Sequence, residues 1–267
     1  MKADHPLVIS KAQLDGLYET YNSRKWVHPD PLEFLYPYEA PRDREVVGMI
    51  ASSLAYGRVA QILKSVGSVL DKMGSSPHDF LEYSTPVSLQ KTFRDFKHRF
   101  TTSKDLTEML YGVKRVIDRY GSLYACFLSG FKDDEDVLTA LSFLVRELTA
   151  LFNGHGNSLI PLPERGSACK RLNLFLRWMV RKDDVDPGSW LGIPTRKLMV
   201  PLDTHMHRIC FFLKMTHRKS ADMRTVREIT RAFRQIEPED PVRYDFALTR
   251  LGIRTDAYPE TLLSSCT

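Results

Sequence analysis

Apolar residues recur at three- and four-residue intervals along most of the chain. Residues 43–74 show this most clearly, and the same intervals return in residues 105–121, 134–154, 224–238 and 239–252. This spacing places apolar side chains on one face of an α-helix. Convincing strand alternation is missing, and no Asn-Gly or Asp-Gly turn joins two alternating segments. The sequence therefore predicts an all-α protein.

Glycine and proline indicate where several of these helices end or begin. Gly74, Gly121 and Gly154 follow the last apolar position of three segments. Glycine is favoured there because it adopts the left-handed conformation that ends many helices. Asp240 is predicted to cap the last helix, with Pro241 at its first position.

Residues 163–181, PERGSACKRLNLFLRWMVR, combine a turn with a basic helix. The polar face of that helix carries Lys170, Asn173, Arg177 and Arg181. Such a stripe is most often the solvated side of a surface helix. The alternative is chemical. A helix N-terminus after a glycine turn presents backbone N–H groups to a phosphate. A lysine one turn into the helix, crowded by cations such as Arg171, loses its proton readily enough to act as an amine nucleophile.

Residues 200–213, VPLDTHMHRICFFL, place an acid and two histidines at the start of another helical pattern. Asp203 is predicted to be the N-cap, where the backbone N–H groups and the helix dipole stabilise its negative charge. A capping role alone is the common meaning of such an aspartate. His205 and His207 diverge if the segment is helical, but on a strand they would share a face and could hold a metal.

The composition is that of an ordinary globular protein, with 43% hydrophobic and 27% charged residues. The net charge of +5 suits a polyanionic partner. Four scattered cysteines without a C-x-x-C pair argue against a cysteine-rich zinc or iron–sulfur site and indicate a reducing compartment. Neither a secretory signal nor an apolar run of membrane-spanning length is recognisable. We expect a soluble cytoplasmic protein.

Four segments resemble the helix-hairpin-helix DNA glycosylases of the endonuclease III superfamily. GSACKRLNLFL resembles their hairpin and second helix, with the pattern Gly-hydrophobic-Gly-x-Lys, and VPLDTHMHRI resembles the Val-Asp-x-His segment that follows. EVVGMIASSLAYGRVAQI looks like their early helix and DNA-inserting turn, and VRYDFALTRLGI looks like their late helix. The segments follow the family's order across residues 45–253. Very similar segments occur in a bacterial family of conserved hypothetical proteins.

The resemblance implies two helical lobes with a cleft between them. Residues 45–181 would form the central lobe with the hairpin, residues 1–44 and 182–267 the second lobe, and residues 181–197 the crossover. It implies Lys170 as the Schiff-base nucleophile and Asp203 as the acid that assists it. The implied partner is double-stranded DNA with a damaged base or an abasic site, bound by a monomer without a metal or other cofactor. Nucleoid association within the cytoplasm follows from that partner.

Extrusion of a nucleotide from the duplex requires a group that fills the gap and surfaces that hold the base and the backbone. Tyr56 is the candidate wedge. The candidate stacking surfaces are Trp178, Trp190 and Phe246, each of which can instead be a core residue. The candidate DNA contacts are Arg58, Arg165, Gly166, Ser167, Arg171 and His205. Ordinary surface charge is the alternative for the arginines.

Three functions stay open at this point. The first is base-excision DNA repair by a DNA glycosylase with AP lyase activity. The second is non-catalytic DNA binding by the same fold, which gains weight because Ala168 replaces the second glycine of the hairpin and Ser167 follows the first. The third is metal-dependent hydrolysis through Asp203, His205 and His207.

Overall fold

The computed structural model describes residues 8–152 and 156–254, and within them the protein is mostly helical, as predicted. The α-helices are α1 Lys11–Tyr21, α2 Pro41–Ser53, α3 Val59–Met73, α4 Pro77–Glu82, α5 Pro86–Thr92, α6 Ser103–Tyr120, α7 Leu123–Ser129, α8 Leu138–Thr149, α9 Lys170–Val180, α10 Thr204–Phe212, α11 Met223–Ile236 and α12 Asp245–Arg254. Short 3-10 helices are η1 Arg24–Trp26, η2 Pro31–Leu35, η3 Pro163–Arg165 and η4 Thr195–Lys197. Among the described residues, no helix is both long and apolar enough to cross a membrane.

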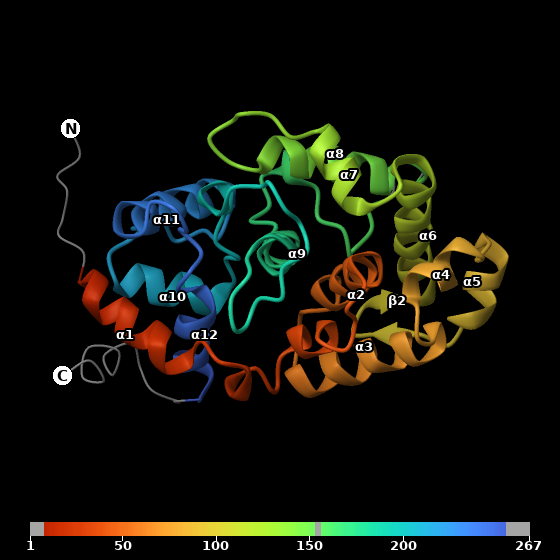
Figure 1. Cartoon of the computed structure of the whole chain (residues 1–267), viewed down its shortest axis with the longest axis horizontal. Helices are drawn as coiled ribbons and strands as arrows, with labels where there is room; N and C mark the ends of the chain where they lie inside the picture. Colours follow the sequence, from red (N-terminus) through yellow and green to blue (C-terminus); the bar gives the residue numbers. More distant parts are fainter. Residues whose placement is uncertain (1–7, 153–155, 255–267) are drawn as a thin grey trace.

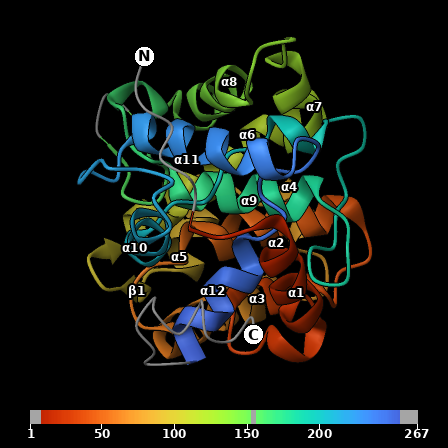
Figure 2. The same cartoon turned by 90° about the vertical axis from the view of Figure 1, so that its left-hand side faces the viewer.

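The two ends of the described chain lie together (Figure 1). Helix α1 packs against α12, and α12 packs against α10, so the red and blue ends of the colour bar share one side of the molecule. Helices α4 to α8 occupy the other side, where α6 contacts α5, α7 and α8. Helix α9 lies between these groups, and a view from the left-hand side shows it behind α11 (Figure 2). The assignment of the groups to separate lobes stays a prediction.

The packing of α9 on α2 forms the centre of the structure. Helix α2 is buried without interruption from Glu45 to Ser53. A Cβ atom on Gly48 would lie 3.0 Å from the Met179 side chain and 3.3 Å from that of Phe175, so the glycine permits the close approach of the two helices. This contact sets the position of the α9 N-terminus relative to the loop after α2.

The predicted helix ends are confirmed where a glycine directly follows the helix. Gly74 and Gly121 follow α3 and α6 with φ of 75° and 83°, the conformations that glycine adopts without steric cost. Helix α8 ends at Thr149, before the predicted Gly154, which lies outside the described residues.

The predicted start of the last helix is wrong. Asp240 does not cap it, because its Oδ2 atom accepts a hydrogen bond from Arg181 Nε at 2.9 Å. Residues 241–244 form turns instead, and α12 begins at Asp245. A tertiary ion pair therefore competes with a local cap and wins, which moves the helix start by several residues.

A two-stranded hairpin that the sequence did not predict lies beside α3. Strand β1, Lys97–His98, pairs antiparallel with β2, Thr101–Thr102, and Arg99 between them has φ of 54°. The buried His98 ring contacts Ser65 Oγ through Nδ1 at 2.9 Å and the Tyr56 carbonyl through Nε2 at 3.0 Å. Strands of two residues are too short for an alternation to be visible, and this hairpin holds the loop after α2.

A buried carboxyl group on α2 connects three segments. Glu45 accepts hydrogen bonds from the Leu123 N–H at 2.8 Å and from Trp190 Nε1 at 2.9 Å. Burial raises the pKa of Glu45 to about 7, against the lowering effect of these donors. The carboxyl group therefore takes up its proton more readily in the folded protein than in the unfolded chain.

The free energy of unfolding should fall as pH rises from about 4.5 to about 7, because the folded state must then ionise a carboxyl group that the unfolded chain ionises earlier. A shift of this size corresponds to about 3 kcal/mol. Glu45→Gln removes the ionisation and should flatten the pH dependence between pH 5 and pH 8 by up to that amount. Urea denaturation at several pH values measures it, with Glu19→Gln at an exposed position of α1 as control. An unchanged pH profile in Glu45→Gln would contradict this assignment.

Candidate active site

Lys170 and Asp203 lie at the N-terminal ends of different helices and face each other. The Lys170 Nζ atom is 3.6 Å from Asp203 Oδ2, and the two side chains are 30% and 35% exposed. Nζ also donates a hydrogen bond to the Ala55 carbonyl, at 3.4 Å. The structure thus brings together the end of α2, the start of α9 and the start of α10, with both functional groups open to solvent.

The turn before α9 determines where the lysine points. Helix η3 ends at Gly166, which has a φ of 74°. Glycine adopts this left-handed conformation without the steric cost that a side chain would add. Cys169 has φ of 47° and gives no side-chain cap, so Lys170 is the first residue of α9 and not one turn inside it. The Gly166 carbonyl accepts a hydrogen bond from the Met223 N–H at 3.0 Å, which ties this turn to α11.

The two oxygen atoms of the Asp203 carboxylate have different partners. Its Oδ1 atom accepts the backbone N–H groups of His205 and Met206 at 2.9 and 2.8 Å, the N-cap geometry predicted for this residue. Its Oδ2 atom faces Lys170. Because the cap fixes the orientation of the group, the second oxygen is held toward the lysine before any ligand binds.

Both side chains line a cavity of about 680 Å³, a volume typical of small-molecule sites. Its apolar wall includes Ile62, Leu174, Leu202 and Phe246. Six of its charged side chains form three ion pairs, Lys170–Asp203, Arg177–Asp245 and Arg250–Asp30, and Arg171 donates to main-chain carbonyls. The cavity therefore offers flat apolar surface together with paired charges.

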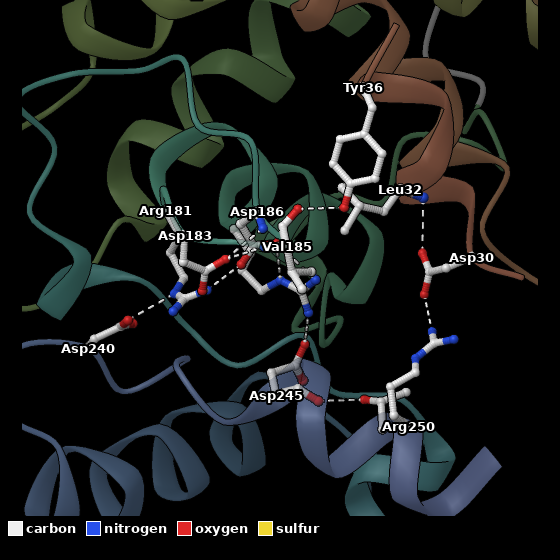
Figure 3. Close-up of polar contacts among 12 residues, drawn as sticks. Asp30, Leu32, Tyr36, Arg181, Asp183, Val185, Asp186, Asp240, Asp245 and Arg250 are labelled. Atoms are coloured by element: carbon white, nitrogen blue, oxygen red, sulfur yellow. Dashed lines mark hydrogen bonds and ion pairs between the residues drawn. The ribbon is translucent and has the colours of Figure 1, made fainter. Parts of the chain in front are cut away.

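The polar face of α9 beyond Lys170 is buried, so the expectation of a solvated basic stripe is wrong. Arg177 contacts both Asp186 and Asp245, and Arg181 contacts Asp186 together with Asp183 and Asp240. These groups surround the end of α9 and the start of α12 (Figure 3). Burial alone would lower the pKa of Arg177, but the carboxylates of Asp186 and Asp245 outweigh it and raise the pKa.

The predicted DNA contacts separate into accessible and internal groups. Arg58, Arg165 and Gly166 are exposed, and Ser167 lines the cavity. Arg171 is partly buried and lines the cavity, and its guanidinium donates to the Ser53 and Ser158 carbonyls at 2.8 and 2.6 Å. These two bonds hold it against the main chain. His205 Nε2 is buried and contacts no hydrogen-bond partner among the described residues.

The predicted wedge, Tyr56, is held inward. Its hydroxyl donates to the His98 carbonyl at 3.0 Å and lies 2.5 Å from Thr101 Oγ1. Its ring stacks on Phe100 at a centroid distance of 5.2 Å, and Phe100 is 67% exposed. The aromatic side chain that projects at this place is thus Phe100, which the sequence analysis missed because it belongs to the unpredicted hairpin.

Only one of the three predicted stacking residues reaches the cavity. Phe246 lines it, with the Arg250 guanidinium 4.9 Å from the ring centroid. Trp178 is completely buried in the core, and Trp190 packs edge-on against Phe175 while donating to Glu45. Neither tryptophan lines the cavity, and for both the core alternative accounts for the position.

The buried thiols offer no nucleophile. Cys126, Cys169 and Cys210 are free and buried, and burial raises the pKa of Cys126 to about 12 and that of Cys169 to about 11. Cys266 lies outside the described residues. Among the amine and thiol groups that line the cavity, Lys170 is therefore the one that solvent can reach.

The sequence profile of a family described as "Protein of unknown function (DUF2400)" matches residues 30–254. The chain belongs to this family. No curated protein and no solved structure matches the chain. The DUF2400 match contains every cavity-lining residue except Pro29, so the cavity belongs to the part of the chain that defines the family. The resemblance to helix-hairpin-helix glycosylases stays a prediction.

The histidines of α10 do not form a metal site in this DUF2400 protein. His207 Nε2 contacts the Arg218 carbonyl at 2.8 Å, and within the described ranges the three residues Asp203, His205 and His207 do not converge. Among the described residues, the possible metal ligands that do lie close together are His78, Asp79 and Glu82 on α4.

Proposed function

We propose that this protein is a base-excision DNA glycosylase with AP lyase activity, with Lys170 as the nucleophile and Asp203 as the assisting acid. The observation that carries the proposal is the 3.6 Å approach of Lys170 Nζ to Asp203 Oδ2 at the wall of a cavity large enough for a nucleoside. An ion pair this exposed contributes only about 0–1 kcal/mol to stability, so it is not needed for the fold.

The two groups suit cleavage of an N-glycosidic bond. Once the Lys170 ammonium group has given up a proton, its amine attacks C1′ of the sugar while the bond from C1′ to the base breaks. The base leaves with the electron pair and takes up that proton. Asp203 stabilises the positive charge that develops on the sugar, with a carboxylate already oriented by its cap. Loss of a proton and opening of the sugar ring give an imine at C1′. Removal of a C2′ proton then expels the 3′ phosphate.

The surroundings of the cavity supply groups for DNA. The exposed Arg58 stands just before α3, next to the cavity-lining Gly57 and Val59. The exposed Arg165 precedes the turn to Lys170. Phe100 offers an exposed ring beside the same loop, of the kind that fills the gap left by an extruded nucleotide. Non-catalytic DNA binding by the same surface is the competing function, and covalent trapping distinguishes the two.

Lys170→Gln should abolish covalent trapping by borohydride on a duplex with an abasic site, because the glutamine amide cannot form an imine. Binding to the same duplex should stay nearly unchanged. The exposed Lys91→Gln serves as the matched control and should trap like the wild type. Efficient trapping by Lys170→Gln would place the nucleophile elsewhere. A wild type that binds DNA but never traps would favour the non-catalytic function.

Asp203→Asn should slow base excision by a hundredfold or more, since a neutral amide stabilises a developing cation far less than a carboxylate. The melting temperature should change little because asparagine also caps helices well. Asp222→Asn is a matched control, for Asp222 caps α11 in the same way but does not line the cavity. Equal excision rates for Asp203→Asn and wild type in single-turnover assays would remove Asp203 from the mechanism.

Binding to duplex DNA should weaken by orders of magnitude between low and moderate salt if several phosphates are contacted. Arg58→Ala and Arg165→Ala should each lower the slope of log affinity against log salt by about 1, the effect of one lost phosphate contact. Fluorescence anisotropy measures the slope. Arg119→Ala, which removes an exposed arginine paired with Glu147, should leave the slope unchanged. Salt-independent binding of the wild type would speak against any DNA function.

A further inference from the structure

Asp245 at the start of α12 is a buried carboxylate that lines the cavity together with Lys170 and Asp203. The proposed reaction does not use it. Asp245 is 5% exposed at its side chain and pairs with Arg177. Figure 3 shows it at the N-terminal end of α12. Burying a carboxylate costs free energy, which its partners must offset. The contacts of Asp245 therefore show which of its oxygens remains free for a ligand.

Only half of the Asp245 carboxylate is used by the protein. The hydrogen bond and the ion pair with Arg177 both involve Oδ2, and no described residue donates a hydrogen bond to Oδ1. Oδ1 is also not among the described buried atoms that lack a partner, so it retains access to solvent. Because the residue lines the cavity, this access is by way of the cavity. Asp245 therefore presents one acceptor to a ligand there.

The acceptor is available near neutral pH. Burial raises the pKa of Asp245 to about 6, and the neighbouring carboxylates of Asp203 and Asp186 act in the same direction, while Arg177 lowers the pKa. Above that pH the group is ionised and accepts hydrogen bonds from N–H donors. Phe246, the next residue, adds an aromatic surface to the same wall.

The other cavity charges restrict the ligand further. Lys170, Arg177 and Arg250 are each paired with a carboxylate. Arg171, which also lines the cavity, donates to main-chain carbonyls. An anionic ligand would be repelled by the free Oδ1 acceptor of Asp245. A neutral, planar group with N–H donors fits better. Guanine-type edges carry two adjacent donors, N1–H and the 2-amino group. Uracil-type edges place carbonyl oxygens on both sides of a single N–H, and these would face the carboxylate.

We propose that Asp245 determines specificity by accepting hydrogen bonds from the extruded base, and that the cavity takes lesions with a guanine-type edge. This inference rests on the proposed glycosylase function and extends it to the class of base. Arg177 is a positioning residue in this arrangement, since it holds Oδ2 and thereby turns Oδ1 toward the cavity.

The test compares single-turnover excision of 8-oxoguanine and 8-oxohypoxanthine, which differ only in the 2-amino group, from otherwise identical duplexes. Wild type should excise 8-oxoguanine about tenfold to a hundredfold faster, the effect of one hydrogen bond to a charged group. In Asp245→Asn the ratio should fall to within about threefold. Trapping of Asp245→Asn on an abasic site, where no base is present, should match wild type.

Asp222→Asn is the matched control, because Asp222 also stands at the start of a helix but does not line the cavity. It should keep the wild-type preference. Equal loss of preference in Asp222→Asn overturns the role of Asp245. Trapping by the wild type without any preference between the two bases, or without excision of either, overturns it as well. Absence of wild-type trapping on abasic sites overturns the glycosylase function itself. The wild-type comparison needs no variant and remains decisive should Asp245→Asn fail to fold.

Discussion

The buried guanidinium of Arg177 is the interaction on which the arrangement of the site depends. It lies inside the protein between Asp186, in the loop after α9, and Asp245, at the start of α12. Removal of one partner from such a buried pair typically costs about 3–5 kcal/mol, because the remaining charge loses its compensation. Arg181 extends the same cluster to Asp183 and Asp240. The cluster thus fixes α12 against α9, and with it one wall of the cavity.

The reactive pair is positioned by helix ends and not by loops alone. Lys170 begins α9, whose packing on α2 is made close by Gly48. Asp203 begins α10 and is oriented by the backbone N–H groups that it caps. Helices are rigid supports, so both groups hold their places without a ligand. The buried Arg177 cluster therefore supports the fold, whereas contact of the exposed arginines with a polyanion belongs to the proposed function.

The sequence indicated the two residues of the candidate site but not its surroundings. Lys170 and Asp203 were identifiable because each follows a local signal, a glycine turn in one case and a helix start in the other. Asp245 was placed inside a helix without a role, since its importance comes from Arg177, which lies on another helix. Phe100 was missed because the hairpin that presents it is too short to show alternation. Trp178 and Trp190 were candidates for a cavity that they do not reach.

The sequence by itself determined the helical class, the ends of α3 and α6 at glycines, and the cap of α10 at Asp203, since each depends on residues within one or two turns. Only the tertiary structure decided that the basic face of α9 is buried, that Arg171 binds main-chain carbonyls, and that Asp240 pairs with Arg181 instead of capping a helix. A charged side chain has the same local preferences whether it ends up buried or exposed. Its burial depends on partners distant in sequence, and the gain from pairing with them outweighs the local preference.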